Sequence, residues 1–144
     1  MKAKRIDVAI LSHPHDDHVE NLIALVEEYH WPIERVLLSD SAWWFGTATN
    51  RRIRELFARE GGAGRVGRPG ERFDWGGGEW LILNPPRGEF AGGASEAANV
   101  SIVYLLSFNG VRALFTGDVE ATVGRRIAAE LKAIADISVA RRPE

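Results

Sequence analysis

The chain has 144 residues, of which 45% are hydrophobic and 26% charged, and 18 basic against 20 acidic side chains give a formal net charge of −2. This is the composition of an ordinary globular protein, and the length fits one domain over 1–144. The absence of cysteine excludes a disulfide scaffold, a thiolate metal site and a cysteine nucleophile, so any metal must be held by His, Asp or Glu.

The first half of the chain alternates short apolar runs with helical patterns. Strands are predicted at 6–11 and 36–38, and helices at 18–30 and 47–60. Pro32 ends the first helical pattern, because a residue before proline is disfavoured in the helical region. Gly61 and Gly62 end the second pattern.

The second half introduces hairpins. Strands are predicted at 72–75, 80–83, 101–108, 111–115 and 137–140, a loop at 85–98, and a helix at 119–134. The Asn109-Gly110 pair between two apolar runs is a strong hairpin signal, because both residues accept a positive φ. Strands and helices therefore alternate with inserted hairpins, which predicts an α/β protein with a mixed sheet.

Three histidines and two aspartates lie within six positions, directly after the first predicted strand. The segment reads His13-Pro14-His15-Asp16-Asp17-His18. Alternate residues of an extended chain project to the same side, so His13 and His15 can converge on one ion, while Asp17 and His18 at the helix start can serve a second. Imidazole and carboxylate suit zinc, manganese and iron. Two ions about 3.5–4 Å apart would activate a hydroxide and stabilise the leaving oxygen.

A further ligand is expected from far along the chain. Thr116-Gly117-Asp118 follows a predicted strand, and the carboxyl ends of strands are where α/β sheets bind ligands. Asp118 is therefore a candidate bridging ligand. It also precedes a predicted helix, for which it can serve as the N-cap.

These motifs resemble the metallo-β-lactamase superfamily, and within it the hydrolase domain of DNA-internalisation competence proteins (the ComEC family) or a free-standing relative. The likeness rests on residues 7–18, on Asn99-x-Ser101 and on residues 114–118. It implies a metallo-β-lactamase-like αββα sandwich, incomplete because strands before residue 6 and a terminal histidine motif after residue 140 are missing.

The resemblance also implies roles for individual residues. His13 and His15 would hold the first of two Zn²⁺ or Mn²⁺ ions, Asp17 and His18 the second, and Asp118 would bridge them. Asp17 would also orient the attacking hydroxide. Asn99 and Ser101, the further candidate catalytic residues, occupy the region where many superfamily members place a third histidine of the first metal site, and Asn99 would contact metal-bound water or a phosphate oxygen. An alternative is that Asn99 ends a loop and Ser101 is an ordinary strand residue.

The implied function is a metal-dependent phosphodiesterase or nuclease related to DNA uptake. Two alternatives remain: a general hydrolase of esters, lactones or lactams, and an inactive truncated metal-binding remnant. Nucleic acid is a candidate partner, because seven arginines lie in 51–72 and could contact phosphates. The aromatic cluster at 43–45 is expected to pack in the core or a lid, and the alternative is that it stacks on bases.

The remaining expectations concern location and assembly. No run approaches the ~20 apolar residues of a membrane span, so a cytoplasmic location is expected for the chain as given, and an extracytoplasmic one if it derives from a membrane competence protein. An exposed sheet edge would favour a homo-oligomer.

Overall fold

The computed structural model describes residues 5–39, 48–59, 63–85 and 98–140. The helices are α1 (Asp16–Glu27), α2 (Ala48–Arg59) and α4 (Ala121–Ala140). The strands are β1 (Ala9–Ile10), β2 (Arg35–Leu38), β3 (Ala63–Val66), β4 (Arg72–Trp75), β5 (Gly78–Asn84), β6 (Val103–Phe108) and β7 (Val111–Phe115). No described helix is long and apolar enough to cross a lipid bilayer.

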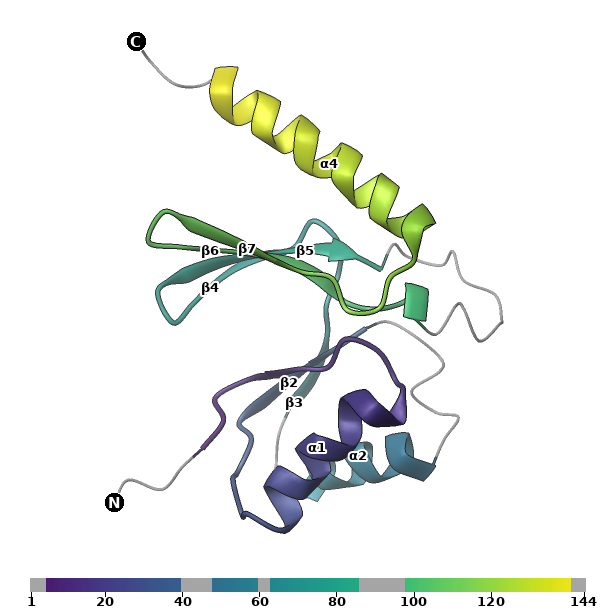
Figure 1. Cartoon of the computed structure of the whole chain (residues 1–144). Coiled ribbons are helices and arrows are strands. Elements are labelled where there is room, and N and C mark those ends of the chain that lie inside the picture. Colours follow the sequence, from purple (N-terminus) through teal and green to yellow (C-terminus); the bar gives the residue numbers. More distant parts are fainter. Residues whose placement is uncertain (1–4, 40–47, 60–62, 86–97, 141–144) are drawn as a thin grey trace.

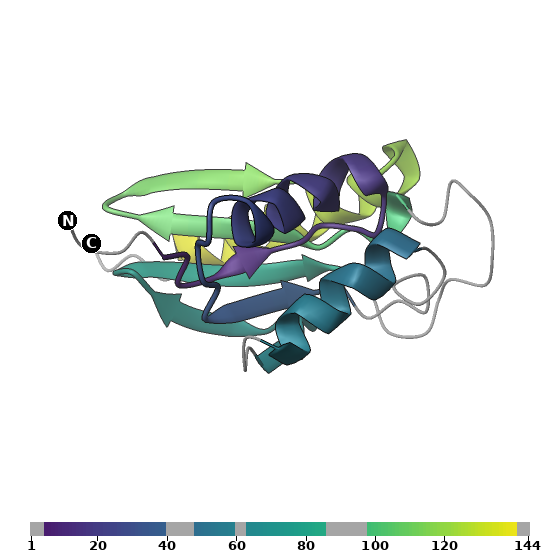
Figure 2. The ribbon, with the colours of Figure 1, turned by 90° about the horizontal axis from the view of Figure 1, so that it is seen from below.

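The elements form four layers. A parallel sheet of order β1-β2-β3 lies between the helices α1 and α2 and a second, antiparallel sheet of order β4-β5-β6-β7, and α4 covers the outer face of that second sheet (Figures 1 and 2). This arrangement confirms the predicted αββα sandwich.

Alternating side chains explain the layers. In β2, Val36 packs with the helices α1 and α2, whereas the next residue, Leu37, packs with Ile82 of β5 between the two sheets. In β5, Leu81 and Leu83 point the other way and pack against α4. Successive side chains of a strand face opposite sides of the sheet. Because β2 and β5 have apolar residues at consecutive positions, each of these strands is buried on both faces.

One backbone hydrogen bond joins the two sheets at the end where the histidines lie. The N–H of Ile102, just before β6, donates to the carbonyl oxygen of Ser12, just after β1, at 2.7 Å. The hairpin turn at Asn109 and Gly110 has the expected positive φ values of 47° and 78° and pairs β6 with β7 in antiparallel register. The carboxyl end of β7 is thereby placed beside the start of β6 and the loop after β1.

Several predicted elements differ from the structure. The predicted strand at 137–140 is wrong, because α4 continues to Ala140; a short apolar run without a preceding Gly or Pro does not distinguish a strand from a helix. The prediction that Asp118 caps this helix is also wrong, since α4 begins three residues later. The sequence reading missed β3, in which Gly64 and Arg65 interrupt the apolar pattern. The aromatic cluster at 43–45 and most of the predicted loop at 85–98 lie outside the described residues.

Candidate metal centre

The histidine segment leaves β1 and enters α1 at the edge where the two sheets meet. His13 is fully buried, whereas Asp16 and Asp17 are exposed in the first turn of α1. Carboxylates are favourable there because the first turn of a helix presents unpaired N–H groups and the positive end of the helix dipole. The segment therefore places buried imidazole next to solvent-facing carboxylate.

His13, His18 and Asp118 meet at one point. Asp118 Oδ2 lies 3.2 Å from His18 Nε2 and 3.6 Å from His13 Nε2. One potential ligand atom from each of the three residues lies within 4.8 Å of the other two. The ring centroids of His13 and His18 are 4.2 Å apart. The fold thus brings one carboxylate from the end of β7 to two imidazoles from the loop after β1.

The other two predicted ligands lie on either side of this group. His15 Nδ1 is 3.0 Å from His13 Nε2, and Asp17 Oδ2 is 3.6 Å from His18 Nε2. The side chain of Asp17 is 80% exposed, in contrast to the 49% of Asp118. All five predicted ligands therefore lie within one continuous cluster.

Burial controls the protonation of His13. Together with the neighbouring His18 and His15, burial lowers the pKa of this imidazole from 6.5 to about 4, against the opposing effect of Asp118 and Asp17. Desolvation penalises the charged form of a base, so His13 is neutral near pH 7. A neutral imidazole is the form that binds a metal.

Ser12 orients two of the histidines, a role that the sequence reading missed. Its hydroxyl oxygen lies 3.1 Å from His13 Nδ1 and 3.3 Å from His18 Nδ1. A hydroxyl oxygen can accept two hydrogen bonds, so both rings can donate from Nδ1 to Ser12 while Nε2 faces Asp118. Metal-binding histidines usually have such a partner on the other ring nitrogen. A serine directly before the first histidine was the available sequence signal.

The turn that carries Asp118 packs closely against Ser12 and Ser101. Gly117 has φ +55°, and a Cβ at this position would lie 2.7 Å from Ser101 Cβ and 3.1 Å from Ser12 Cβ. The N–H of Asp118 donates to Ser101 Oγ at 3.3 Å. Only glycine accommodates both the backbone conformation and this approach, so Gly117 is required for the position of Asp118.

The two predicted polar site residues hold the loops around the cluster. Ser101 is fully buried, and its hydroxyl donates to the carbonyl oxygen of Ala98 at 2.6 Å. Asn99 Oδ1 accepts a hydrogen bond from the N–H of Glu120 at 2.9 Å, and its amide nitrogen donates to the Glu120 carboxylate at 3.2 Å. These contacts make both residues positioning groups for 98–101 and 118–120, and their predicted contact with reacting atoms stays a prediction.

A buried asparagine, also missed by the sequence reading, supports this region. Asn84, at the end of β5, is fully buried and donates to the carbonyl oxygens of Asn99 at 2.9 Å and Ser101 at 2.7 Å. Arg126 of α4 donates to the Asn84 side-chain oxygen. A buried amide with these three partners has its main hydrogen-bonding needs met. It ties the segment beside the metal centre to both β5 and α4.

The donor set fits a metal ion. Zinc, manganese and iron accept imidazole and carboxylate ligands in proteins. Here a buried neutral imidazole, further imidazoles and carboxylates lie together. Asp118 Oδ2 lies 3.6 Å from His13 Nε2 and 3.2 Å from His18 Nε2, and Asp17 Oδ2 lies 3.6 Å from His18 Nε2, so carboxylates stand beside both imidazoles. The residues present therefore fit one or two divalent ions.

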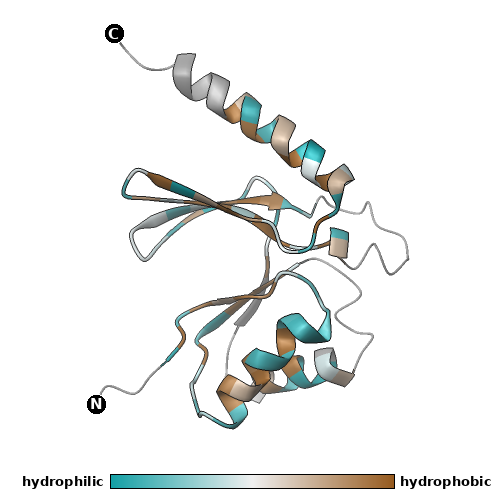
Figure 3. Ribbon diagram, in the orientation of Figure 1, coloured by the Kyte–Doolittle hydropathy of each residue, from teal (hydrophilic) through white to brown (hydrophobic). Residues whose placement is uncertain are grey.

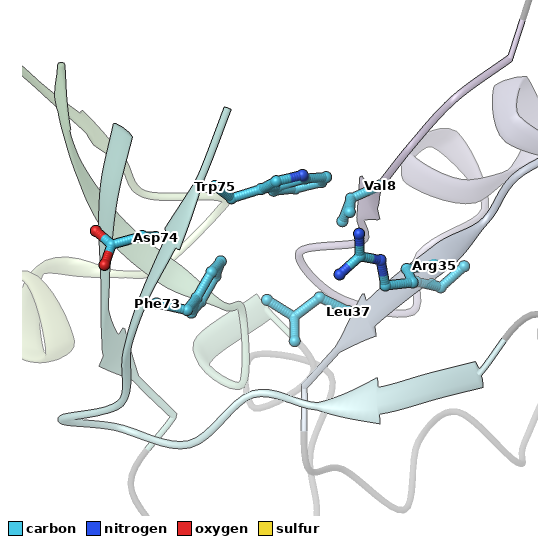
Figure 4. Close-up of a pocket in the computed structure, with 7 residues that line it drawn as sticks. Val8, Arg35, Leu37, Phe73, Asp74 and Trp75 are labelled. Carbon is cyan, nitrogen blue, oxygen red and sulfur yellow. The ribbon is translucent and has the colours of Figure 1, made fainter. Parts of the chain in front are cut away.

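A separate cavity lies nearer the amino ends of the parallel strands. It has a volume of about 220 Å³, and its lining includes Val8, Arg35, Leu37, Phe73 and Trp75 (Figure 4). The Arg35 guanidinium carbon lies 5.7 Å from the centre of a Trp75 ring. The histidines follow the carboxyl end of β1, so this cavity is not part of the metal centre.

Two solved structures have a similar fold. CmlA, a diiron beta-hydroxylase from Streptomyces venezuelae, is 20% identical with a TM-score of 0.53, over 88% of this chain and 23% of that one. A mutant of CmlA beta-hydroxylase is 21% identical with a TM-score of 0.50, over 81% of this chain and 21% of that one. This chain thus spans less than a quarter of the length of either structure, and the similarity is one of fold.

Sequence comparison identifies the family. No match to the chain was found among curated proteins. The family model described as the metallo-beta-lactamase superfamily matches residues 1–130. Because that match includes both sheets and every residue of the candidate metal centre, the chain belongs to the metallo-β-lactamase superfamily.

Proposed function

We propose that this chain is a metal-dependent hydrolase, organised as one domain over 1–144, that cleaves phosphodiesters. The observation that carries the proposal is the meeting of His13, His18 and Asp118 at one point, from two different sheets. Membership of the metallo-β-lactamase superfamily supports the proposal, because proteins of this family are in general metal-dependent enzymes.

The contacts support a division of the ligands between two ions. His13 and His15 approach each other at 3.0 Å, and Asp17 and His18 at 3.6 Å. Asp118 Oδ2 lies near His13 of the first pair and His18 of the second. We infer that His13 and His15 would hold one ion and Asp17 and His18 the other, with Asp118 as a shared ligand. Two divalent ions, Zn²⁺ or Mn²⁺, would supply Lewis-acid stabilisation of the charge that develops on the phosphate oxygens.

The chain's own side chains have distinct tasks in this proposal. Neutral His13 anchors the centre because burial prevents it from being protonated near pH 7. Asp17, the most exposed of the ligands, can accept a hydrogen bond from the attacking water at its carboxylate and orient it. Ser101 acts through Asp118, whose backbone N–H it holds, and Asn99 acts through Glu120.

The substrate class rests on the resemblance of the three motifs to the ComEC-type hydrolase domain. By that resemblance the substrate is nucleic acid, and the reaction accompanies DNA uptake. Two other readings make different predictions. A general superfamily hydrolase would prefer an ester, lactone or lactam, and an inactive remnant would bind metal without turnover. CmlA is a diiron beta-hydroxylase, so bound iron without hydrolysis would favour oxygenase chemistry instead.

The experiment combines metal analysis with a substrate panel. Purified protein is analysed for zinc, manganese and iron, then assayed with bis-p-nitrophenyl phosphate, single-stranded DNA, a p-nitrophenyl ester, a lactone and a lactam. We expect metal-dependent cleavage of the two phosphodiesters, lost in His13→Ala and His15→Ala. His30→Asn is the matched control, because His30 is exposed beyond the end of α1 with φ 53°, which asparagine tolerates.

Each outcome decides between the readings. Cleavage of the phosphodiesters that follows metal content, and that His30→Asn leaves unchanged, supports the proposal. Faster cleavage of the ester, lactone or lactam overturns the substrate class but keeps the hydrolase. Metal content that His13→Ala and His15→Ala leave unchanged overturns the metal centre itself.

A further inference from the structure

The buried side chain of Asn84, at the end of β5, lies on the side of the sheet that faces α4. Ile82 packs between the two sheets and Leu83 packs against α4, so strict alternation would turn Asn84 back between the sheets. Instead the register with β6 shifts after Ile82, and Asn84 lies opposite Val103, which packs with α4. Paired residues share one face of a sheet. This bulge therefore redirects Asn84 into the layer between β5 and α4.

Arg126 of α4 meets Asn84 in this layer. Figure 3 shows apolar and polar residues alternating along the first turns of α4. Val123 and Ile127 form part of the apolar stripe that packs on the sheet, and Arg126 lies at the border of this stripe. Its guanidinium donates to the side-chain oxygen of Asn84 and, at 3.5 Å, to the carbonyl oxygen of Leu83. Helix packing thus brings a charged donor to a buried amide.

Arg126 permits only one orientation of the Asn84 amide. A guanidinium has donors and no acceptor, so it must face the amide oxygen. The amide nitrogen then donates to the carbonyl oxygens of Asn99 and Ser101, at 2.9 Å and 2.7 Å. The opposite orientation would set donor against donor and oxygen against oxygen in all three contacts. Glu130, one helical turn further on, accepts a hydrogen bond from Arg126 at 2.6 Å and holds it in place.

The two carbonyl groups belong to the residues that hold the Asp118 turn. Ser101 Oγ accepts the N–H of Asp118 at 3.3 Å, and Asn99 Oδ1 accepts the N–H of Glu120 at 2.9 Å. Glu120 directly precedes α4. The hydrogen bonds therefore form a closed circuit, which runs from α4 through Asn84 to the segment before β6 and back to the turn at the start of α4.

We propose that Arg126 and Asn84 are positioning residues of the candidate metal centre, and that they fix Asp118 where it can serve as a ligand. This inference rests on the role of Asp118 in the proposed function. Both residues act through the turn, so their effect on metal affinity requires the Asp118 carboxylate. The circuit specifies one arrangement, because a buried polar network is stable only when every member has its partner.

Arg126→Met tests the circuit at a partly exposed position, since Asn84 itself is fully buried. Methionine lacks the donor but keeps a long apolar side chain, so α4 can still pack. We expect the dissociation constant for Zn²⁺ to rise about tenfold in the full chain, the lower end of the loss typical for groups behind a metal ligand. Arg126→Lys retains a charged donor and should lie closer to the wild type. Arg125→Met, at the exposed neighbouring arginine, is the matched control and should bind Zn²⁺ as the wild type does.

A double-mutant cycle tests the route of the effect. Arg126→Met should cause no further loss of Zn²⁺ affinity once Asp118→Asn has removed the carboxylate, because the two changes then act on the same interaction. A structural role unrelated to this ligand would instead lower the affinity by the same factor in both backgrounds.

Amide hydrogen exchange of the metal-free full chain tests the position of the turn without an ion. The N–H groups of Asp118 and Glu120 each have a side-chain acceptor in the circuit. We expect both to exchange about tenfold faster in Arg126→Met than in Arg125→Met, because the loosened segment holds these acceptors less firmly. The β6–β7 ladder is the internal reference, since a general loss of stability would accelerate exchange there as well.

The outcomes separate this proposal from the proposed function. Faster exchange confined to the turn, together with a loss of Zn²⁺ affinity that requires Asp118, supports it. Equal exchange in Arg126→Met and Arg125→Met would overturn it, and so would equal Zn²⁺ affinity or a loss that persists undiminished with Asp118→Asn. A chain that binds no metal overturns the proposed function, and the exchange comparison then decides by itself whether Arg126 holds the turn.

Discussion

His18 Nε2 lies 3.2 Å from Asp118 Oδ2, although His18 stands in the first turn of α1 and Asp118 follows the last strand of the opposite sheet. At the same end the N–H of Ile102 donates to the carbonyl oxygen of Ser12 and joins the two sheets. The position of the candidate metal centre is therefore a property of the packing between the sheets.

Asp118→Asn tests whether this carboxylate is a ligand. We expect metal affinity to fall at least tenfold, since a neutral amide is a poor substitute for a shared carboxylate. The free energy of unfolding of the metal-free protein should change little, because the side chain is 49% exposed. Isothermal titration with Zn²⁺ and Mn²⁺ provides the affinity. Asp74→Asn, an exposed carboxylate on β4, should bind metal as the wild type does.

Ser12→Ala tests the orientation of the imidazoles. The substitution removes the hydroxyl near the Nδ1 atoms of His13 and His18, which leaves both rings free to rotate or change tautomer. Loss of such a partner typically costs about 10–100-fold in metal affinity. Metal titration monitors the change, with Ser107→Ala on β6 as the matched control. Equal affinities for the two variants would contradict the orienting role of Ser12.

Ser101→Ala tests the anchor of the Asp118 turn. The buried hydroxyl donates to the carbonyl oxygen of Ala98 and accepts the N–H of Asp118. Removing it leaves the N–H of Asp118 without this partner and takes one of two hydrogen bonds from the Ala98 carbonyl oxygen, which also accepts the N–H of Ser101. We expect this to cost about 1–3 kcal/mol in the free energy of unfolding. Urea denaturation of the metal-free protein measures this loss. A role confined to contact with substrate would instead leave stability unchanged and alter only the kinetics.

Gly117→Ala tests the close approach of the turn. The new Cβ would lie 2.7 Å from Ser101 Cβ in a backbone with φ +55°, so the turn must move and Asp118 with it. Gly110→Ala is the control, because Gly110 has φ +78° but no heavy atom within 4 Å of an added Cβ. Both variants should lose about 1–3 kcal/mol of stability from backbone strain. Only Gly117→Ala should also lose metal affinity.

The stability of the metal-free protein should depend on pH through His13. Burial and the neighbouring His18 and His15 lower the pKa of His13 from 6.5 to about 4, so between these values the unfolded chain binds a proton that the folded chain does not. The free energy of unfolding is therefore unaffected by His13 above pH 6.5. It falls by up to about 3 kcal/mol as the pH drops from 6.5 to 4. Denaturation in the presence of a chelator measures the slope. His13→Gln should reduce it, and His30→Asn should leave it unchanged.

Local sequence determined much of the architecture. The apolar periodicities indicated the helices α1 and α2, which pack on the parallel sheet, the strands β1 and β2, and the two hairpins. Each pattern shows which faces of an element are buried. The spacing of His13, Pro14, His15, Asp17 and His18 after a strand indicated a metal centre at that strand's carboxyl end. These features depend on neighbours within a few residues, so they can be read from the chain alone.

Only the tertiary structure decided the rest. Local propensity does not encode that the apolar run at 137–140 continues α4. It also does not encode the strand β3, which lacks an apolar pattern and forms by pairing with β2. The roles of Ser12, Asn84 and Gly117 likewise arise where distant segments meet, since a hydrogen bond or close approach between residues far apart in sequence exists only after the sheets have packed. Sequence thus located the histidines, and the packing of the two sheets brought Asp118 to them.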